Sequence, residues 1–137
     1  MEGKRCMKRY WTCSIDDINE HLAGGIVRVN GYHDNTEEIW FECKDGTTIR
    51  FYHEQDCCES VYLESSDGLT NNVDIFTDCK WCKIEEVKTE ESRDYDDSHT
   101  WTFYKFTTDK GYDTLRWFGT SNGYYSESVD CEIWINK

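Results

Sequence analysis

The most constraining feature of this chain is a pair of cysteine-containing segments separated by about twenty residues. The first, FYHEQDCCESVY, covers residues 51–62 and contains one histidine and two adjacent cysteines. The second is the C-x-x-C motif CKWC at residues 79–82. Imidazole and thiolate groups are the usual ligands of structural zinc, which takes four of them in a tetrahedron. The two segments therefore predict a bound Zn²⁺ ion, with candidate ligands His53, Cys57, Cys58, Cys79 and Cys82.

Only one of the two adjacent cysteines is expected to face the metal, because neighbouring residues of a strand point to opposite sides. The H-x3-C spacing of His53 and Cys57 favours Cys57. Other interpretations remain open: the cysteines form disulfides, the C-x-x-C motif is redox-active, or the thiols are small buried groups. Since the candidate ligands outnumber the positions on one ion, a closed structural site is favoured over a catalytic one.

The chain length of 137 residues predicts one domain, residues 1–137, with a core of its own. The first ten residues are polar, and no apolar run follows them, so we expect neither a signal peptide nor a membrane span. A cytoplasmic protein is the resulting expectation. In a reducing compartment, eight cysteines favour metal ligands or buried thiols over disulfides.

The net charge of −13 is unevenly distributed. Residues 1–10 carry four basic side chains against one acidic one, a balance of +3, so the remainder carries −16. Such a surface repels nucleic acids and membrane phosphates, and it attracts a basic groove on a protein. Ordinary solubility is the other explanation of the acidic surface.

Residues 85–97 concentrate the negative charge, with seven acidic residues against two basic ones, a net charge of −5. We expect residues 90–98 to form an exposed loop between strands, either as a solvated turn or as a contact surface for a basic partner. The candidate contact residues are Glu85, Glu86, Glu90, Glu91, Asp94, Asp96 and Asp97.

Two local patterns predict the elements most clearly. Ser14, followed by two acidic residues, is typical of a helix start, and Gly24-Gly25 ends that short helix. Residues 38–43 and 47–53 predict a hairpin. A three-residue loop with Gly46 in the left-handed conformation pairs Ile39 with Phe51, and it keeps the apolar residues of both strands on one face.

The remaining strands follow from alternation and turn signals, and residues 65–77 are expected to be a loop or a short helix. These strands are expected at residues 26–32, 61–64, 83–89, 100–107, 112–118 and 124–135. The predicted fold class is α+β, mostly β: an antiparallel sheet of six to eight strands with a short N-terminal helix and a zinc-clipped middle segment. Aromatic residues on both faces indicate that part of the sheet is covered on both sides or curls.

The chain lacks a nucleophile-elbow motif, a phosphate-binding glycine-rich loop and a dinucleotide-binding fingerprint. A nucleophilic pair of His53 and Cys57 would need only two groups, and so would not explain five clustered ligands. We therefore expect a protein that is not an enzyme.

Four strings of the sequence resemble an uncharacterised family of small proteins encoded by bacteriophages and mobile elements of Gram-positive bacteria. They are FYHEQDCCESVY, HTWTFYKFTT, GYDTLRWFG and SNGYYSESV. The resemblance covers roughly residues 20–130. The chain departs from the family pattern at residues 79–82, where an apolar strand without cysteines would be expected.

The resemblance and the acidic surface together suggest an anti-CRISPR protein, which binds a host CRISPR effector nuclease through its basic channel and blocks the loading of target DNA. Such a protein would act in the cytoplasm of the infected bacterium without binding nucleic acid or membrane itself. The alternatives are a phage accessory or virion-associated protein, in which zinc only stabilises the fold, and, in third place, a thiol or zinc enzyme.

Overall fold

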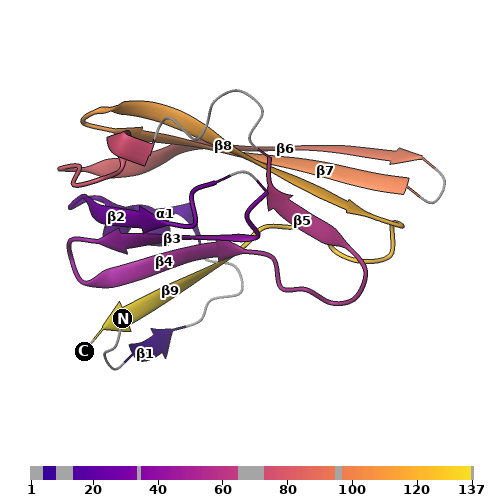
Figure 1. Ribbon diagram of the computed structural model, residues 1–137, viewed down its shortest axis with the longest axis horizontal. Coiled ribbons are helices and arrows are strands. Elements are labelled where there is room, and N and C mark those ends of the chain that lie inside the picture. Colours follow the sequence, from indigo (N-terminus) through magenta and orange to yellow (C-terminus); the bar gives the residue numbers. More distant parts are fainter. Residues whose placement is uncertain (1–4, 9–13, 34, 65–72, 95–96, 137) are drawn as a thin grey trace.

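A computed structural model of the chain describes residues 5–8, 14–33, 35–64, 73–94 and 97–136. Within these residues the chain forms nine antiparallel strands, one α-helix and one 3₁₀ turn (Figure 1). The elements are β1 (Arg5–Lys8), α1 (Ile15–Leu22), β2 (Ile26–Asn30), β3 (Glu38–Cys43), β4 (Thr47–Tyr52), β5 (Ser60–Leu63), η2 (Val73–Ile75), β6 (Cys82–Asp94), β7 (Asp97–Thr108), β8 (Gly111–Ser121) and β9 (Asp130–Asn136). The mostly β, antiparallel fold with a short N-terminal helix is confirmed.

The strands are divided between two sheets, whereas the sequence analysis expected one sheet of six to eight strands. The five-stranded sheet has the order β1-β9-β4-β3-β2, and the four-stranded sheet has the order β5-β8-β7-β6. Figure 1 shows the two sheets as stacked layers. The two inward faces pack on each other, which accounts for the buried aromatic residues, while outward rings such as Trp101 and Phe118 pack on one another with centroids 4.7 Å apart.

The central hairpin has the predicted register. Ile39 pairs with Phe51, and Phe41 pairs with Ile49. Gly46 closes the loop with a φ of 93°, a left-handed conformation that residues with a side chain rarely adopt. This register places Ile39, Phe41, Ile49 and Phe51 on the inward face, where all four are buried.

Aromatic rings from both sheets meet in the core. Phe41 of β3 stacks on Phe106 of β7 with ring centroids 5.1 Å apart, and Phe51 of β4 contacts Tyr104 of β7, also at 5.1 Å. Phe76, which follows η2, packs edge-on against Phe106 at 5.5 Å. Pairs of this geometry stabilise a core beyond the area that they bury.

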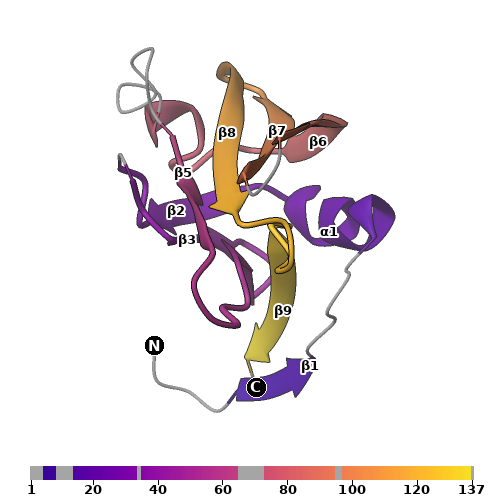
Figure 2. The same ribbon diagram turned by 90° about the vertical axis from the view of Figure 1, so that its right-hand side faces the viewer.

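The helix α1 begins where the sequence predicted. The side chain of Ser14 accepts a hydrogen bond from the backbone N–H of Asp17 at 3.0 Å, which caps the first turn. Ile18 and Leu22 are buried, so one face of the helix joins the core. In Figure 2, α1 lies beside β6.

The two largest differences from the expected boundaries concern the acidic segment and the last strand. Residues 90–94 and 97–98 belong to the long strands β6 and β7, so the exposed loop expected at residues 90–98 was wrong. Acidic residues on both faces of a strand have the pattern of a loop, which is why alternation did not reveal these strands. The last strand begins at Asp130, six residues later than expected, and residues 122–129 lie outside the strands.

Candidate functional sites

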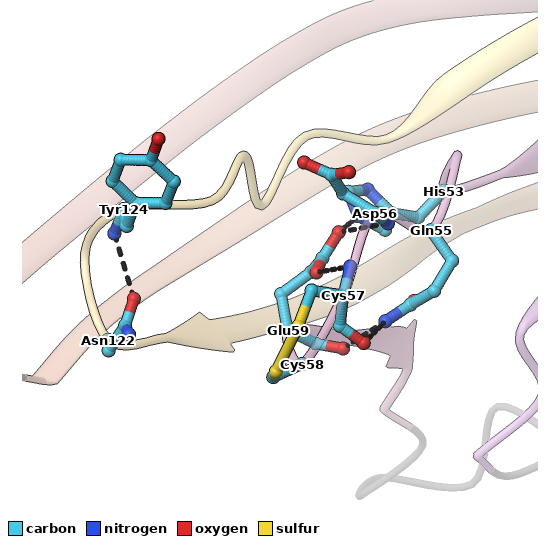
Figure 3. Close-up of a disulfide and its surroundings, with 8 residues drawn as sticks. All are labelled: His53, Gln55, Asp56, Cys57, Cys58, Glu59, Asn122 and Tyr124. Atoms are coloured by element: carbon cyan, nitrogen blue, oxygen red, sulfur yellow. Dashed lines mark hydrogen bonds and ion pairs between the residues drawn. A yellow bond between two sulfur atoms is a disulfide. The ribbon is translucent and has the colours of Figure 1, made fainter.

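The loop between β4 and β5 is organised around a buried pair of side chains, His53 and Glu59 (Figure 3). The Nε2 atom of His53 lies 2.7 Å from Oε2 of Glu59, and the side chains are 3% and 0% exposed. The Nδ1 atom of His53 lies 2.7 Å from the carbonyl oxygen of Ser128. Both ring nitrogens are therefore engaged by an oxygen atom within hydrogen-bond distance, and neither is free to bind a metal ion.

Glu59 also holds the backbone of its own loop. Its carboxylate accepts hydrogen bonds from the N–H groups of Asp56 at 2.8 Å and Cys57 at 2.9 Å. Burial by itself would raise the pKa of Glu59, but the hydrogen bonds from His53 and from these N–H groups outweigh it and lower the pKa to about 2. The carboxylate is therefore charged at neutral pH and fully engaged.

The adjacent cysteines of this loop are joined to each other. Cys57 and Cys58 form a disulfide across a sequence separation of one, and both residues are exposed (Figure 3). Sulfur atoms bonded in this way are not thiolates, so neither residue presents a zinc ligand in this structure. This differs from the prediction from the sequence, in which one of the two cysteines binds the metal.

The C-x-x-C motif lies at the other end of the β3–β4 hairpin. The backbone of Cys79 packs so closely against Gly25 that a side-chain carbon at Gly25 would come within 2.1 Å of the Cys79 carbonyl oxygen. Gly25 precedes Ile26, which pairs with Cys43. Cys43 is the last residue of β3, beside the turn of the hairpin, whereas His53 follows the far end of β4. The five steps of β4 between these ends span about 17 Å, too far for one zinc ion to bind ligands from both.

Cys43, Cys79 and Cys82 are all free and buried. Burial raises the pKa of the Cys43 thiol to about 12, and it also raises the pKa values of Cys79 and Cys82. The turn of the motif is tied by Asp109, whose carboxylate accepts a hydrogen bond from the N–H of Lys80 at 2.7 Å. Protonated thiols in an apolar core pack as small apolar groups.

The structure therefore does not bring the five predicted zinc ligands together. No group of three or more histidine, cysteine, aspartate or glutamate side chains is placed to hold a metal ion within the residues that the structure describes. Zinc binding stays a prediction from the sequence, and no proposal below depends on it.

A cavity of about 620 Å³ opens beside His53. Arg50 in its wall donates to Glu38 at 2.7 Å and to Glu132 at 3.0 Å, and its guanidinium lies 3.8 Å from the centre of the Tyr52 ring. Arg50, Glu59 and Glu132 were not identified from the sequence, because single charged residues in strands carry no spacing signal of their own. The charges of Arg50, Glu59 and Glu132 already have partners, and His53 is bonded to Glu59. These groups therefore stabilise the wall of the cavity.

The acidic residues gather on the hairpin formed by β6 and β7, which we call the acidic arm and define as residues 85–94 and 97–103. Every residue from Glu85 to Asp94 is exposed. Lys88 forms an ion pair with Glu90 at 3.3 Å, and Glu85 accepts a hydrogen bond from Thr107 at 2.7 Å. The predicted contact residues found exposed are Glu85, Glu86, Glu90, Glu91, Asp94 and Asp97, while Asp96 lies outside the described residues.

None of the helices in the described ranges is long and apolar enough to cross a membrane.

Residues 14–131 match a protein family described as a domain of unknown function, DUF7448. The match covers most of the chain, so the chain belongs to this family. No curated protein and no solved structure matches the chain.

Proposed function

We propose that this DUF7448 protein is an acidic binding protein without catalytic activity, which occupies a basic surface of a partner protein. The observation that carries the proposal is the acidic arm: its carboxylates are exposed on a regular hairpin of two long strands. A hairpin holds such charges at fixed spacing, whereas a flexible loop would have to be ordered on binding at an entropic cost.

The rest of the molecule supports a role in binding more than one in catalysis. His53 has both ring nitrogens engaged, Cys57 and Cys58 are bonded to each other, and the thiols of Cys43, Cys79 and Cys82 are buried. A nucleophile needs an adjacent base with a free lone pair, and these groups do not supply such a pair. Exposed carboxylates, above all those of the acidic arm, are the most abundant feature of the described surface.

The narrower form of the proposal names the partner as a CRISPR effector nuclease of a bacterial host. Its support is the sequence resemblance to phage and mobile-element proteins, together with the basic channel in which such nucleases hold a guide–target duplex. The acidic arm would take the place of nucleic-acid phosphates in that channel, so target DNA could not load. Electrostatic steering would speed the association and make it sensitive to salt.

The experiment measures binding of the purified protein to a guide-loaded CRISPR effector nuclease, and cleavage of target DNA, over a range of salt concentrations. We expect stoichiometric binding that weakens steeply with salt and that competes with target DNA. Absence of both binding and inhibition would overturn the narrower form and favour a phage accessory role.

A matched pair of variants locates the contact. The arm variant carries Glu86→Gln, Glu90→Gln, Glu91→Gln and Asp94→Asn, and the control variant carries Asp16→Asn, Glu20→Gln, Glu37→Gln and Asp74→Asn. All eight positions are exposed, and each variant loses four negative charges. We expect the arm variant to bind about tenfold more weakly or worse than the control. Equal losses in both variants would show that net charge, and not the arm, drives binding.

A further inference from the structure

The strand β6 forms an edge of the four-stranded sheet and is thirteen residues long. On one side it pairs with β7 along its whole length, and Figure 1 shows the two strands side by side as long arrows. A strand edge presents a row of N–H and C=O groups that can pair with another extended chain. Proteins usually shorten, cover or interrupt edges of this length.

Only the start of this edge is covered within the described residues. The side-chain amide of Asn19 in α1 donates to the carbonyl oxygen of Ile84 at 3.1 Å and accepts from its N–H at 2.7 Å. Asn19 thus bonds to Ile84 as a neighbouring strand would. It also shows that the main-chain groups of Ile84 point away from β7.

The alternation of an antiparallel ladder then identifies the free groups further along. One extra residue is inserted between Ile84 and Glu86, and past this bulge the outward residues follow every second position. The main-chain groups that face outward are those of Val87, Thr89, Glu91 and Arg93. All four residues are exposed, and within the described ranges no other segment is bonded to their main-chain groups on the side away from β7.

The side chains around this edge select what can pair with it. A second copy of this chain brings a net charge of −13 and an equally acidic edge, so like charges oppose self-pairing. An extended segment bearing lysine or arginine meets Glu86, Glu90 and Glu91 with complementary charge. A hollow of about 310 Å³ lies on the inward side of the arm, lined in part by Val87, Thr89, Glu91 and Glu127, and it can receive long basic side chains.

We infer that the edge of β6 from Glu86 to Arg93 takes up an extended basic segment of the partner as an added strand. Main-chain hydrogen bonds would supply affinity, and alternate basic side chains would supply specificity. This inference rests on the proposed binding of a basic partner, and it adds the mode of binding. Strand addition, unlike attraction between charges, requires that the outward N–H groups are free.

The test separates hydrogen bonding from charge. The probe is a short capped peptide that alternates lysine with threonine, and its twin carries N-methyl groups on alternate amides, so that one edge cannot pair while the charge is unchanged. Binding is measured by isothermal titration calorimetry. We expect the unmodified peptide to bind and the methylated twin to bind about tenfold more weakly or worse.

A matched pair of variants makes the same test on the protein. Thr89→Pro removes an outward N–H without removing a bond to β7, which an edge strand tolerates, and Thr89→Ala keeps that N–H. Neither variant changes the charge. We expect about tenfold weaker peptide binding for Thr89→Pro and near-unchanged binding for Thr89→Ala, with slower hydrogen exchange at Val87, Thr89 and Glu91 when the peptide is bound. Thermal melting checks that Thr89→Pro is folded, and the methylated peptide carries the test if it is not.

Three outcomes would overturn strand addition. If both peptides bind equally and both lose affinity for the arm variant, the basic partner stands but strand addition is wrong. If neither peptide binds, strand addition is again wrong, while the nuclease experiment still judges the proposed function separately. A protein dimer in sedimentation that disappears in Thr89→Pro would assign the edge to a second copy of the chain.

Discussion

Glu59 and Glu90 are the same residue type in opposite surroundings. Glu59 is fully buried and is bonded to His53 and to two backbone N–H groups. Glu90 has a side chain that is 54% exposed, and its ion pair with Lys88 is open to water. The first carboxylate holds a loop in place, and the second is available to another molecule.

The difference shows that charge count and charge function are separate properties in this chain. An exposed ion pair contributes little to stability, because water screens it and two long side chains must be ordered. A buried pair is strongly coupled to the fold, because removing one partner leaves an uncompensated charge in the interior. The predictions below test this contrast, beginning with the largest effect.

The largest effect is expected from Glu59→Ala, which removes the buried partner of His53 Nε2 and the acceptor of two backbone N–H groups. We expect the free energy of unfolding to fall by about 3–5 kcal/mol. The matched control, Glu90→Ala, should change it by no more than about 0.5 kcal/mol. Urea denaturation of both variants checks this, and similar losses in the two would remove the contrast.

Acid should weaken the same loop. The folded pKa of Glu59 is about 2, below the usual value of 4.5, so its stabilising contribution is complete above pH 4.5. As the pH falls from 4.5 towards 2, the carboxylate takes up a proton more readily in the unfolded chain than in the folded one, and that contribution is lost. The urea midpoint should fall more steeply in this window for the wild type than for Glu59→Gln, and parallel curves would contradict the assignment.

Asn19→Ala tests the part of the β6 edge that is covered within the described residues. It removes both hydrogen bonds to Ile84 and leaves the main chain of a buried residue without these partners. We expect a loss of about 1–3 kcal/mol. Hydrogen exchange should also quicken at Ile84, whereas Glu90→Ala should leave that amide unchanged.

The arm variant should be nearly neutral for stability. Its four substitutions remove like charges from an exposed hairpin, so we expect the free energy of unfolding to stay within about 0.5 kcal/mol of the wild type. Its loss of binding would then be a surface effect. A large drop in melting temperature would show that the arm carboxylates serve the fold as well.

The smallest effect concerns zinc. His53 and the C-x-x-C motif lie at opposite ends of the β3–β4 hairpin, so His53→Gln should leave the zinc content of the purified protein unchanged. Metal analysis of protein prepared without chelator checks this. A fall in zinc content for His53→Gln would restore the single centre predicted from the sequence.

The parts of the fold that could be predicted are those governed by local rules. Ile39 and Phe51 pair as expected because only one loop length keeps the apolar residues of the hairpin on one face. Ser14 caps α1 for an equally local reason. The strands of the acidic arm were missed at residues 90–94, because a strand exposed on both faces has no alternation to detect.

The candidate site was harder to predict for a different reason. The sequence places His53 and Cys57 at a chelating distance along the chain, but the partner that His53 uses is Glu59, one of many acidic residues. Whether residues 51–62 and 79–82 converge depends on which end of the hairpin each one meets. That is a property of the tertiary arrangement, and spacing along the chain does not contain it.

The two hydrogen bonds between Asn19 and Ile84 restrict any chain that adds to the sheet at β6. They block the start of the edge, so an added chain can pair with β6 only from Glu86 onward, as far as Arg93. At the rise of a β-strand, those eight residues form a pairing edge about 25 Å long. The fold would thereby set both the length and the starting point of the added strand, whatever its side chains are.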